Sequence, residues 1–118
     1  MKKENRIKKN HEIASIVNLR KKVVNKSFVI YYKENKNEKS RFAFSVSKKY
    51  GHAFERNKAK RISRNLFRKY INKYSNIDFV VVLKPNLKEM LYSDLEKEVD
   101  FLFTLINKNL KKEKKSVK

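Results

Sequence analysis

Residues 47–69 read SKKYGHAFERNKAKRISRNLFRK, and the rest of the chain is most simply interpreted as support for this segment. At 3.6 residues per turn, the helix that it predicts has one apolar arc and one adjoining cationic arc. The apolar arc contains Ala59, Ile62, Leu66, Phe67, Tyr70 and Ile71, and the cationic arc contains Asn57, Lys60, Arg61, Arg64 and Arg68. One arc can therefore pack against a sheet while the other presents cations in a fixed array.

The use of arginine in this segment favours phosphate recognition. The chain has 25 Lys but only seven Arg, and four of the seven fall here: Arg56, Arg61, Arg64 and Arg68. A planar guanidinium donates two hydrogen bonds to one phosphate, whereas an ammonium group acts as a point charge. On charge alone, a solvated helix face explains the run equally well, and the choice of arginine shifts the balance toward a binding surface.

The composition predicts one folded and strongly basic domain. A length of 118 residues is enough for a single hydrophobic core. The 40% hydrophobic content and the fourteen Phe and Tyr residues argue against a disordered tail. A formal net charge of +20 implies an anionic partner, for which nucleic acid is the leading candidate and an anionic membrane surface the lesser one.

The sequence also argues against several classes of protein. No apolar run approaches ~18 residues, so we expect no membrane span. The absence of cysteine excludes disulfides and thiolate metal sites, and with no secretory signal in view we expect a cytoplasmic protein. No nucleophile with a base, carboxylate pair or metal-ligand cluster is visible, and His52 has no partner in sequence. A polypeptide active site is therefore not expected.

The remaining patterns predict the element order α-β-β-α-β-α. The predicted elements are helices over residues 10–19 and 93–110, the basic helix after Gly51, and strands over 27–33, 41–47 and 77–83. Residues 34–40 are all polar and predict a hairpin loop, while the nearly continuous apolar run at 77–83 indicates an interior strand. We expect an α/β two-layer sandwich, in which helices cover a small mixed sheet.

Both ends of this single domain, residues 1–118, are basic. We expect residues 1–9 and 111–118 to be flexible. Arg6, Lys8 and Lys9 form a candidate phosphate-contacting arm, although a frayed solubilising terminus explains their charge equally well.

Residues 56–61 read RNKAKR and follow FSVSKKYG at 44–51, and together these segments resemble the protein subunit of bacterial ribonuclease P. The resemblance covers nearly the whole chain. It implies a small basic RNA-binding protein that binds a catalytic RNA and the 5′ leader of precursor tRNA, and that assists endonucleolytic removal of the leader. It also implies a fold similar to domain 2 of ribosomal protein S5, with a left-handed βαβ crossover around the basic helix.

The resemblance also implies roles for particular residues. The residues that match the family's contacts to the catalytic RNA are Lys48, Lys49, Arg56, Asn57, Lys58, Lys60, Arg61 and Arg64. We add Arg68 from the same helical face. Its leader-binding cleft contains Ile13, Val17, Tyr31 and Ser45, and Arg6 matches its basic arm. Lys58 stands where the family usually has arginine, and His52 replaces a common asparagine. Ile13 and Val17 stand where phenylalanine is frequent, so this cleft has less aromatic surface for stacking.

The implied partners are one catalytic RNA subunit per protein and precursor tRNA, with no membrane and no protein partner evident. The implied reaction is that of an endoribonuclease producing 5′-phosphomonoesters, carried by the RNA with its bound Mg²⁺. We expect no cofactor, metal included, to bind the protein alone tightly. The main alternative is a ribosomal or other structural RNA-binding protein, and the third is a metal-dependent nuclease acting without RNA.

Overall fold

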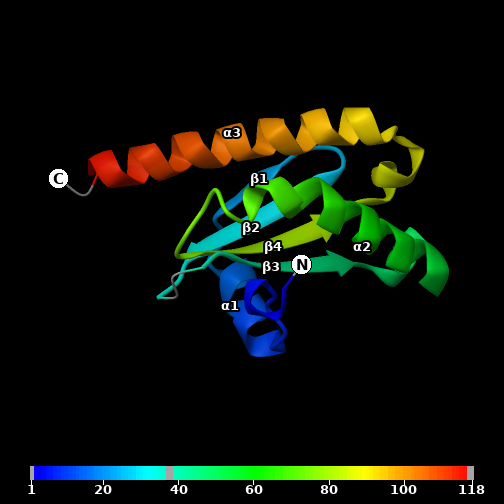
Figure 1. Ribbon diagram of the computed structural model, residues 1–118, viewed down its shortest axis with the longest axis horizontal. Helices are drawn as coiled ribbons and strands as arrows, with labels where there is room; N and C mark the ends of the chain where they lie inside the picture. Colours follow the sequence, from blue (N-terminus) through cyan, green and yellow to red (C-terminus); the bar gives the residue numbers. More distant parts are fainter. Residues whose placement is uncertain (1, 37–38, 117–118) are drawn as a thin grey trace.

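The computed structural model describes residues 2–36 and 39–116 and has seven main elements (Figure 1). They are α1 (Asn10–Asn18), β1 (Lys22–Val24), β2 (Phe28–Glu34), β3 (Arg41–Val46), α2 (Ala53–Phe67), β4 (Ile77–Leu83) and α3 (Tyr92–Ser116). Four short 3₁₀ turns connect them: η1 (Lys3–Asn5), η2 (Lys48–Tyr50), η3 (Arg68–Tyr70) and η4 (Pro85–Glu89). None of the helices among these residues is long and apolar enough to cross a bilayer.

Strand β4 occupies an interior position in the four-stranded sheet, whose order is β1-β2-β4-β3. It pairs antiparallel with β2, where Ile30 lies opposite Val81, and parallel with β3, where Phe44 lies opposite the same residue. All residues of β4 except Val82 are buried, which confirms the interior strand predicted from the apolar run. Strand β1, which pairs with β2, was not predicted, because three residues are too few to show an alternating pattern.

The predicted hairpin between β2 and β3 is wrong. The two strands are not neighbours, because β4 lies between them, so residues 34–40 connect strands across an intervening one. An interior strand is covered on both faces and paired on both edges, and the nearly continuous apolar run of β4 suits that position best. The polar loop indicated a chain reversal correctly, but it carried no information on which strands pair.

The connection from β3 through α2 to β4 joins parallel neighbours by a left-handed crossover (Figure 1). This handedness is an exception to the usual rule for βαβ units and agrees with the resemblance noted above. The crossover lays α2 over β3, with its apolar arc against the sheet. Its cationic arc is thereby left facing outward beside an edge strand.

The apolar arc predicted for the basic helix is confirmed. Ala59, Leu66, Phe67 and Tyr70 are buried, and Ile62 and Ile71 pack against the same core. Phe67 lies among four other aromatic rings, those of Phe28, Phe42, Phe44 and Phe103, at centroid distances of 5.5–6.1 Å. Burying a side chain of this size contributes about 2–3 kcal/mol before packing is counted. Helix α2 is therefore held in place mainly by its buried arc.

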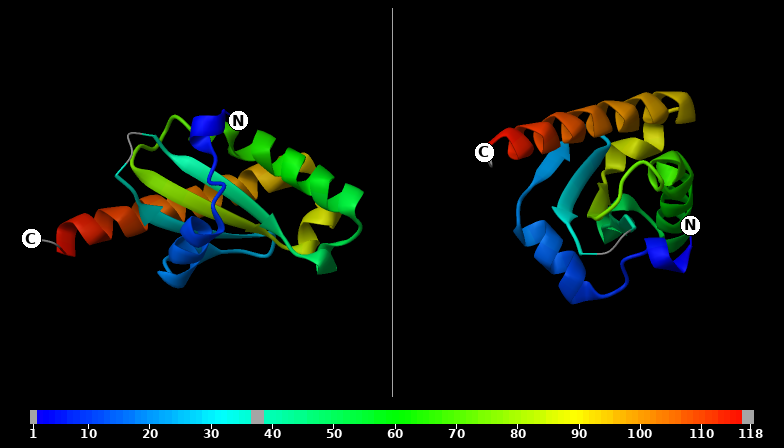
Figure 2. Two further views of the ribbon diagram at one scale, coloured as in Figure 1. Left: turned by 90° about the horizontal axis from the view of Figure 1, so that it is seen from below. Right: turned by 60° about the vertical axis from the view of Figure 1, so that its left-hand side comes forward.

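The helices divide between the two faces of the sheet (Figure 2). α2 and α3 cover one face and enclose the main core, which confirms the predicted α/β sandwich. α1 lies on the other face, over a smaller cluster formed by Ile7, Ile16, Ala43 and Val80. Because α1 has only nine residues, it covers only part of that face.

Both chain ends form more secondary structure than the sequence analysis predicted. We expected residues 1–9 to lack structure, but the Asn5 Nδ2 donates to the Ser40 carbonyl at 2.8 Å, and the Ile7 amide donates to the Phe42 carbonyl at 3.0 Å. Ile7 fixes this segment to the sheet. The sequence analysis missed it because one apolar residue among several lysines gives no periodic pattern. α3 likewise continues to Ser116, past the predicted end at residue 110, while Met1, Val117 and Lys118 lie outside the described residues.

Candidate nucleic-acid interface

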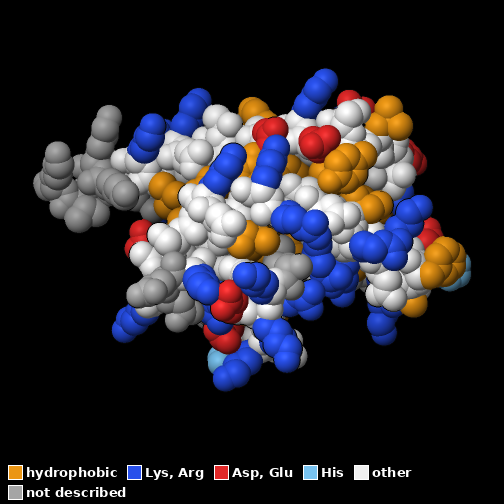
Figure 3. Space-filling view, viewed as in Figure 1, with side chains coloured by type: hydrophobic (Ala, Val, Ile, Leu, Met, Phe, Trp, Pro, Cys, Tyr) orange, Lys and Arg blue, Asp and Glu red, His pale blue; other side chains and the backbone are white. Residues whose placement is uncertain are grey.

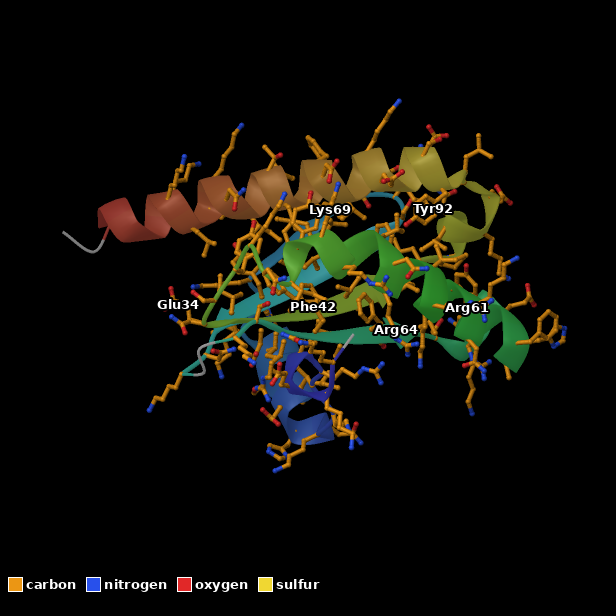
Figure 4. All side chains as sticks on the ribbon, in the orientation of Figure 1. Glu34, Phe42, Arg61, Arg64, Lys69 and Tyr92 are labelled. Atoms are coloured by element: carbon orange, nitrogen blue, oxygen red, sulfur yellow. The ribbon has the colours of Figure 1, made fainter. Side chains whose placement is uncertain are left out.

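The basic face of α2 consists of cations fixed on a helix whose opposite side is buried. Asn57, Lys58, Arg61 and Arg68 are exposed, and Arg56, Lys60 and Arg64 are partly buried. Arg61 and Arg64 project from the side of α2 that faces away from α3 (Figure 4). Lys48 and Lys49, in the η2 turn that precedes the helix, are also exposed. The structure thus presents the cations that the sequence grouped together on α2, on the η2 turn that precedes it and, for Arg68, on the η3 turn that follows it.

Acidic residues do not neutralise this face. Among the side chains that the structure describes, none of the cations of α2 forms an ion pair. The acids pair instead with lysines elsewhere: Asp100 with Lys69 at 2.7 Å, Glu55 with Lys88 at 3.3 Å, Glu98 with Lys26 at 3.8 Å and Glu4 with Lys39 at 2.6 Å. The guanidinium groups of Arg61, Arg64 and Arg68 are therefore available to bind anions.

The turn into α2 depends on the one glycine. Gly51 has φ of 155°, a conformation that side chains rarely adopt, and a Cβ there would lie 2.6 Å from the Glu55 Oε1. That oxygen accepts a hydrogen bond from the His52 amide at 3.0 Å. This hydrogen bond, together with Lys88, lowers the pKa of Glu55. Arg56 donates to the Gly51 carbonyl at 2.9 Å. Arg56 therefore stabilises the turn and is only partly free for a ligand.

A second surface lies between α1 and the sheet, and it contains the predicted cleft residues. Ile13 and Val17 on α1 and Tyr31 on β2 are partly buried and pack on the same cluster. Ser45 is exposed on β3, two residues beyond Ala43 on the same face of the sheet. The Lys22 ammonium, which the sequence analysis did not select, lies 5.7 Å from the centroid of the Tyr31 ring. The structure therefore places all four predicted residues on one side of the sheet.

The N-terminal arm runs beside the edge strand β3. Arg6 forms an isolated parallel bridge with Phe42, and the side chains of Arg6, Lys8 and Lys9 are exposed. Lys and Arg side chains gather over α2 and the neighbouring N-terminal segment in one view of the surface (Figure 3). The arm can therefore add charge next to the basic face of α2.

An ion-pair network that the sequence analysis missed fixes α1 to the sheet. The Arg41 guanidinium donates to Asp78 on β4 at 2.9 and 2.7 Å and to Glu12 on α1 at 2.7 Å. These hydrogen bonds raise the pKa of Arg41, and the bond to Arg41 lowers the pKa of Glu12. Asp78, an acid in an otherwise apolar strand, was the signal that could have revealed it. Arg41 therefore links α1 to the sheet, and its guanidinium is already bound by two carboxylates.

Comparisons with known proteins agree with this geometry. The family model described as Ribonuclease P matches residues 1–107. The ribonuclease P protein component of Fusobacterium nucleatum is 40% identical over 104 residues, which cover 84% of this chain and 94% of that protein. That of Phytoplasma australiense is 42% identical over 101 residues, covering 81% and 85%.

Solved structures of the same kind superpose closely on this fold. The ribonuclease P protein of Staphylococcus aureus, in a mutant with defective mRNA degradation activity, matches with a TM-score of 0.82 at 31% identity, covering 89% of this chain and 90% of that one. The ribonuclease P protein of Thermotoga maritima matches with a TM-score of 0.71 at 28% identity, covering 82% and 94%. The agreement of sequence, fold and basic surface leads to one conclusion: the chain belongs to the ribonuclease P protein family.

Proposed function

We propose that this chain binds the RNA subunit of ribonuclease P through the basic face of α2, and the 5′ leader of precursor tRNA through the cleft between α1 and the sheet. The observation that carries the proposal is the array of cations on α2, which form no ion pair with any described side chain, on a helix held by a buried aromatic core. Because the helix is already fixed by its buried arc, only the side chains of the array lose conformational freedom when they bind phosphates. Lys48, Lys49 and the basic arm would extend this contact.

The cleft offers a different kind of contact. Tyr31 supplies its aromatic ring, Ile13 and Val17 supply apolar surface, and Ser45 supplies a hydroxyl at the exposed end. Such a surface suits an unpaired strand, whose bases can stack or pack on apolar side chains. A leader bound here would be held beside an RNA bound on α2, so one small protein would position both.

In this proposal the protein contributes affinity and orientation, and the RNA subunit with its bound Mg²⁺ carries out hydrolysis. The cations would screen the repulsion between two polyanions, which is strongest when Mg²⁺ is scarce. One protein per RNA subunit is expected, in the cytoplasm, where precursor tRNA is made.

The test is cleavage of a precursor tRNA at low Mg²⁺ concentration by RNA alone, protein alone, and both together. A fourth arm replaces Arg56, Lys60, Arg61 and Arg64 by Ala. Its matched control replaces Lys97, Lys108, Lys111 and Lys112, exposed lysines of α3, by Ala, which removes the same charge. We expect efficient cleavage by the wild-type pair and the control pair, and a large loss with the α2 variant.

The other arms separate the alternatives. If the protein adds nothing to the RNA, the proposal fails, and co-purification with whole ribosomal particles would then favour a structural ribosomal role. Cleavage by protein alone would favour an RNA-free nuclease. This arm is included also because an mRNA degradation activity is named for the Staphylococcus aureus relative.

A further inference from the structure

The first turn of α2 carries an aromatic side chain that the proposed function leaves unused. Phe54 is 72% exposed, more than any other large hydrophobic side chain that the structure describes. Single exposed apolar residues are common on protein surfaces. What distinguishes Phe54 is how its ring is held and what surrounds it.

One face of the Phe54 ring is supported. The imidazole of His52 lies nearly parallel to it, with an interplanar angle of 8° and a centroid distance of 5.8 Å. The high exposure of Phe54 means that most of its surface remains in contact with water. A ring supported on one side and open on the other is the arrangement on which a planar ligand stacks.

Beside Phe54 lies a hollow of about 420 Å³ between α2, η4 and the start of α3, which we name the Phe54 hollow. Its lining includes Tyr50, Phe54, Ile62, Leu87 and Tyr92. Hydrophobic side chains at the N-terminal end of α2 and near the start of α3 are visible in Figure 3, bordered by Lys and Arg. The hollow can therefore accept an apolar, planar group from solvent.

The charges around the hollow favour an anion-bearing ligand. Lys58, on its lining, is exposed and forms no ion pair with any described side chain. The acid on the lining, Glu55, is already paired with Lys88, whose ammonium also lies 4.7 Å from the Tyr50 ring centroid. A second copy of a chain with net charge +20 would be repelled from this rim, whereas a nucleotide combines a stacking base with a phosphate.

We propose that the Phe54 hollow binds an unpaired base of RNA, stacked on the open face of Phe54, with Lys58 facing its phosphate. This inference rests on the proposed function, because the base would belong to the same RNA that the basic face of α2 binds. Helix α2 would then contact RNA in two ways, through phosphates along its arginines and through a base at its N-terminal turn.

The experiment measures affinity of the full-length chain for the ribonuclease P RNA of the same genome, by filter binding at several salt concentrations. We expect Phe54→Ala to lower affinity by about 5-fold to 100-fold and Phe54→Tyr to stay within about twofold of wild type. The salt slope of Phe54→Ala should be unchanged, because no phosphate contact is lost. The matched control is Phe101→Ala, which removes another exposed ring, 56% exposed on α3. It should change neither the RNA affinity nor its salt slope.

Arg61→Ala, measured in parallel, separates base binding in the Phe54 hollow from RNA binding by the basic face of α2. If Phe54→Ala binds the RNA as tightly as wild type while Arg61→Ala binds it more weakly, the base-binding role of the Phe54 hollow is overturned and the proposed function stays intact. No RNA binding by the wild-type chain would overturn both. Unchanged RNA affinity with loss of a dimer in sedimentation would assign the hollow to protein contact and overturn its role as a base site.

Discussion

The basic face of α2 and the cleft beneath α1 lie on opposite faces of one sheet, and they differ in how their charges are used. On α2, the arginines have no acidic partner among the described side chains, and the nearby acids Asp100 and Glu55 pair with Lys69 and Lys88. Beneath α1, Arg41 is bound by both Asp78 and Glu12, and Ile13, Val17 and Tyr31 pack on a small apolar cluster. This difference is the reason why we propose phosphates as the ligand of the first surface and bases as the ligand of the second.

The largest expected effect comes from removing the anchor of α2. Phe67→Ala deletes a fully buried ring that contacts four others, so we expect unfolding free energy to fall by about 3–5 kcal/mol. Urea denaturation followed by circular dichroism measures this loss. Phe101→Ala removes the same side chain from an exposed site and should change stability by less than about 0.5 kcal/mol. Equal losses in the two variants would show that α2 is not held by its buried arc.

The second prediction distinguishes the two surfaces by their salt dependence. Replacing Arg61 and Arg64 by Ala should reduce the slope of log affinity for the RNA subunit against log salt by roughly 0.7–0.9 per lost contact. Tyr31→Ala should weaken binding of a leader-bearing precursor by about 1–3 kcal/mol without changing that slope. Titrations at four salt concentrations, with a leaderless tRNA as control, measure both. A reduced slope for Tyr31→Ala would remove the distinction between the surfaces.

Local periodicity explains how much of the first surface could be predicted. The 3.6-residue pattern of the basic helix identified both its buried arc and its cations, because each depends only on spacing within one element. The interior position of β4 followed from its apolar run for the same reason. The family resemblance, and not the pattern, supplied the left-handed crossover and the cleft residues.

Apart from the short strand β1 and the extra length of α3, the missed features depend on contacts between distant segments. The pairing of β2 with β4, the docking of Ile7 beside Phe42 and the bridge from Glu12 to Arg41 join residues that have no spacing relation in the sequence. Their local signals were weak: one apolar residue among lysines, and one acid in an apolar strand. The cleft was therefore the less predictable surface, because it is assembled from α1, β2, β3 and β4 together.

The third prediction tests the network that fixes α1 above the cleft. The folded-state pKa of Glu12 lies below the ordinary value of 4.5, so its contribution is present above that pH and is lost as pH falls through the lower folded value. The pair is partly exposed, so we expect an effect below about 1 kcal/mol. Hydrogen exchange of α1 amides between pH 3 and 6 should show this loss in wild type and not in Glu12→Gln. The same acid dependence in both proteins would exclude Glu12 as its source.

The smallest expected effect sharpens the view of α2 as a phosphate-binding surface. Lys58→Arg keeps the charge but supplies two parallel donors to one phosphate, so we expect RNA affinity to rise about twofold, or roughly 0.4 kcal/mol, with no change in salt slope. The same substitution at Lys97 on α3 is the control, because that exposed lysine lies outside both proposed surfaces. An equal gain at Lys97 would mean that arginine strengthens RNA contact wherever it is placed. A gain confined to Lys58 would instead show that donor geometry on this helix, and not charge alone, selects the ligand.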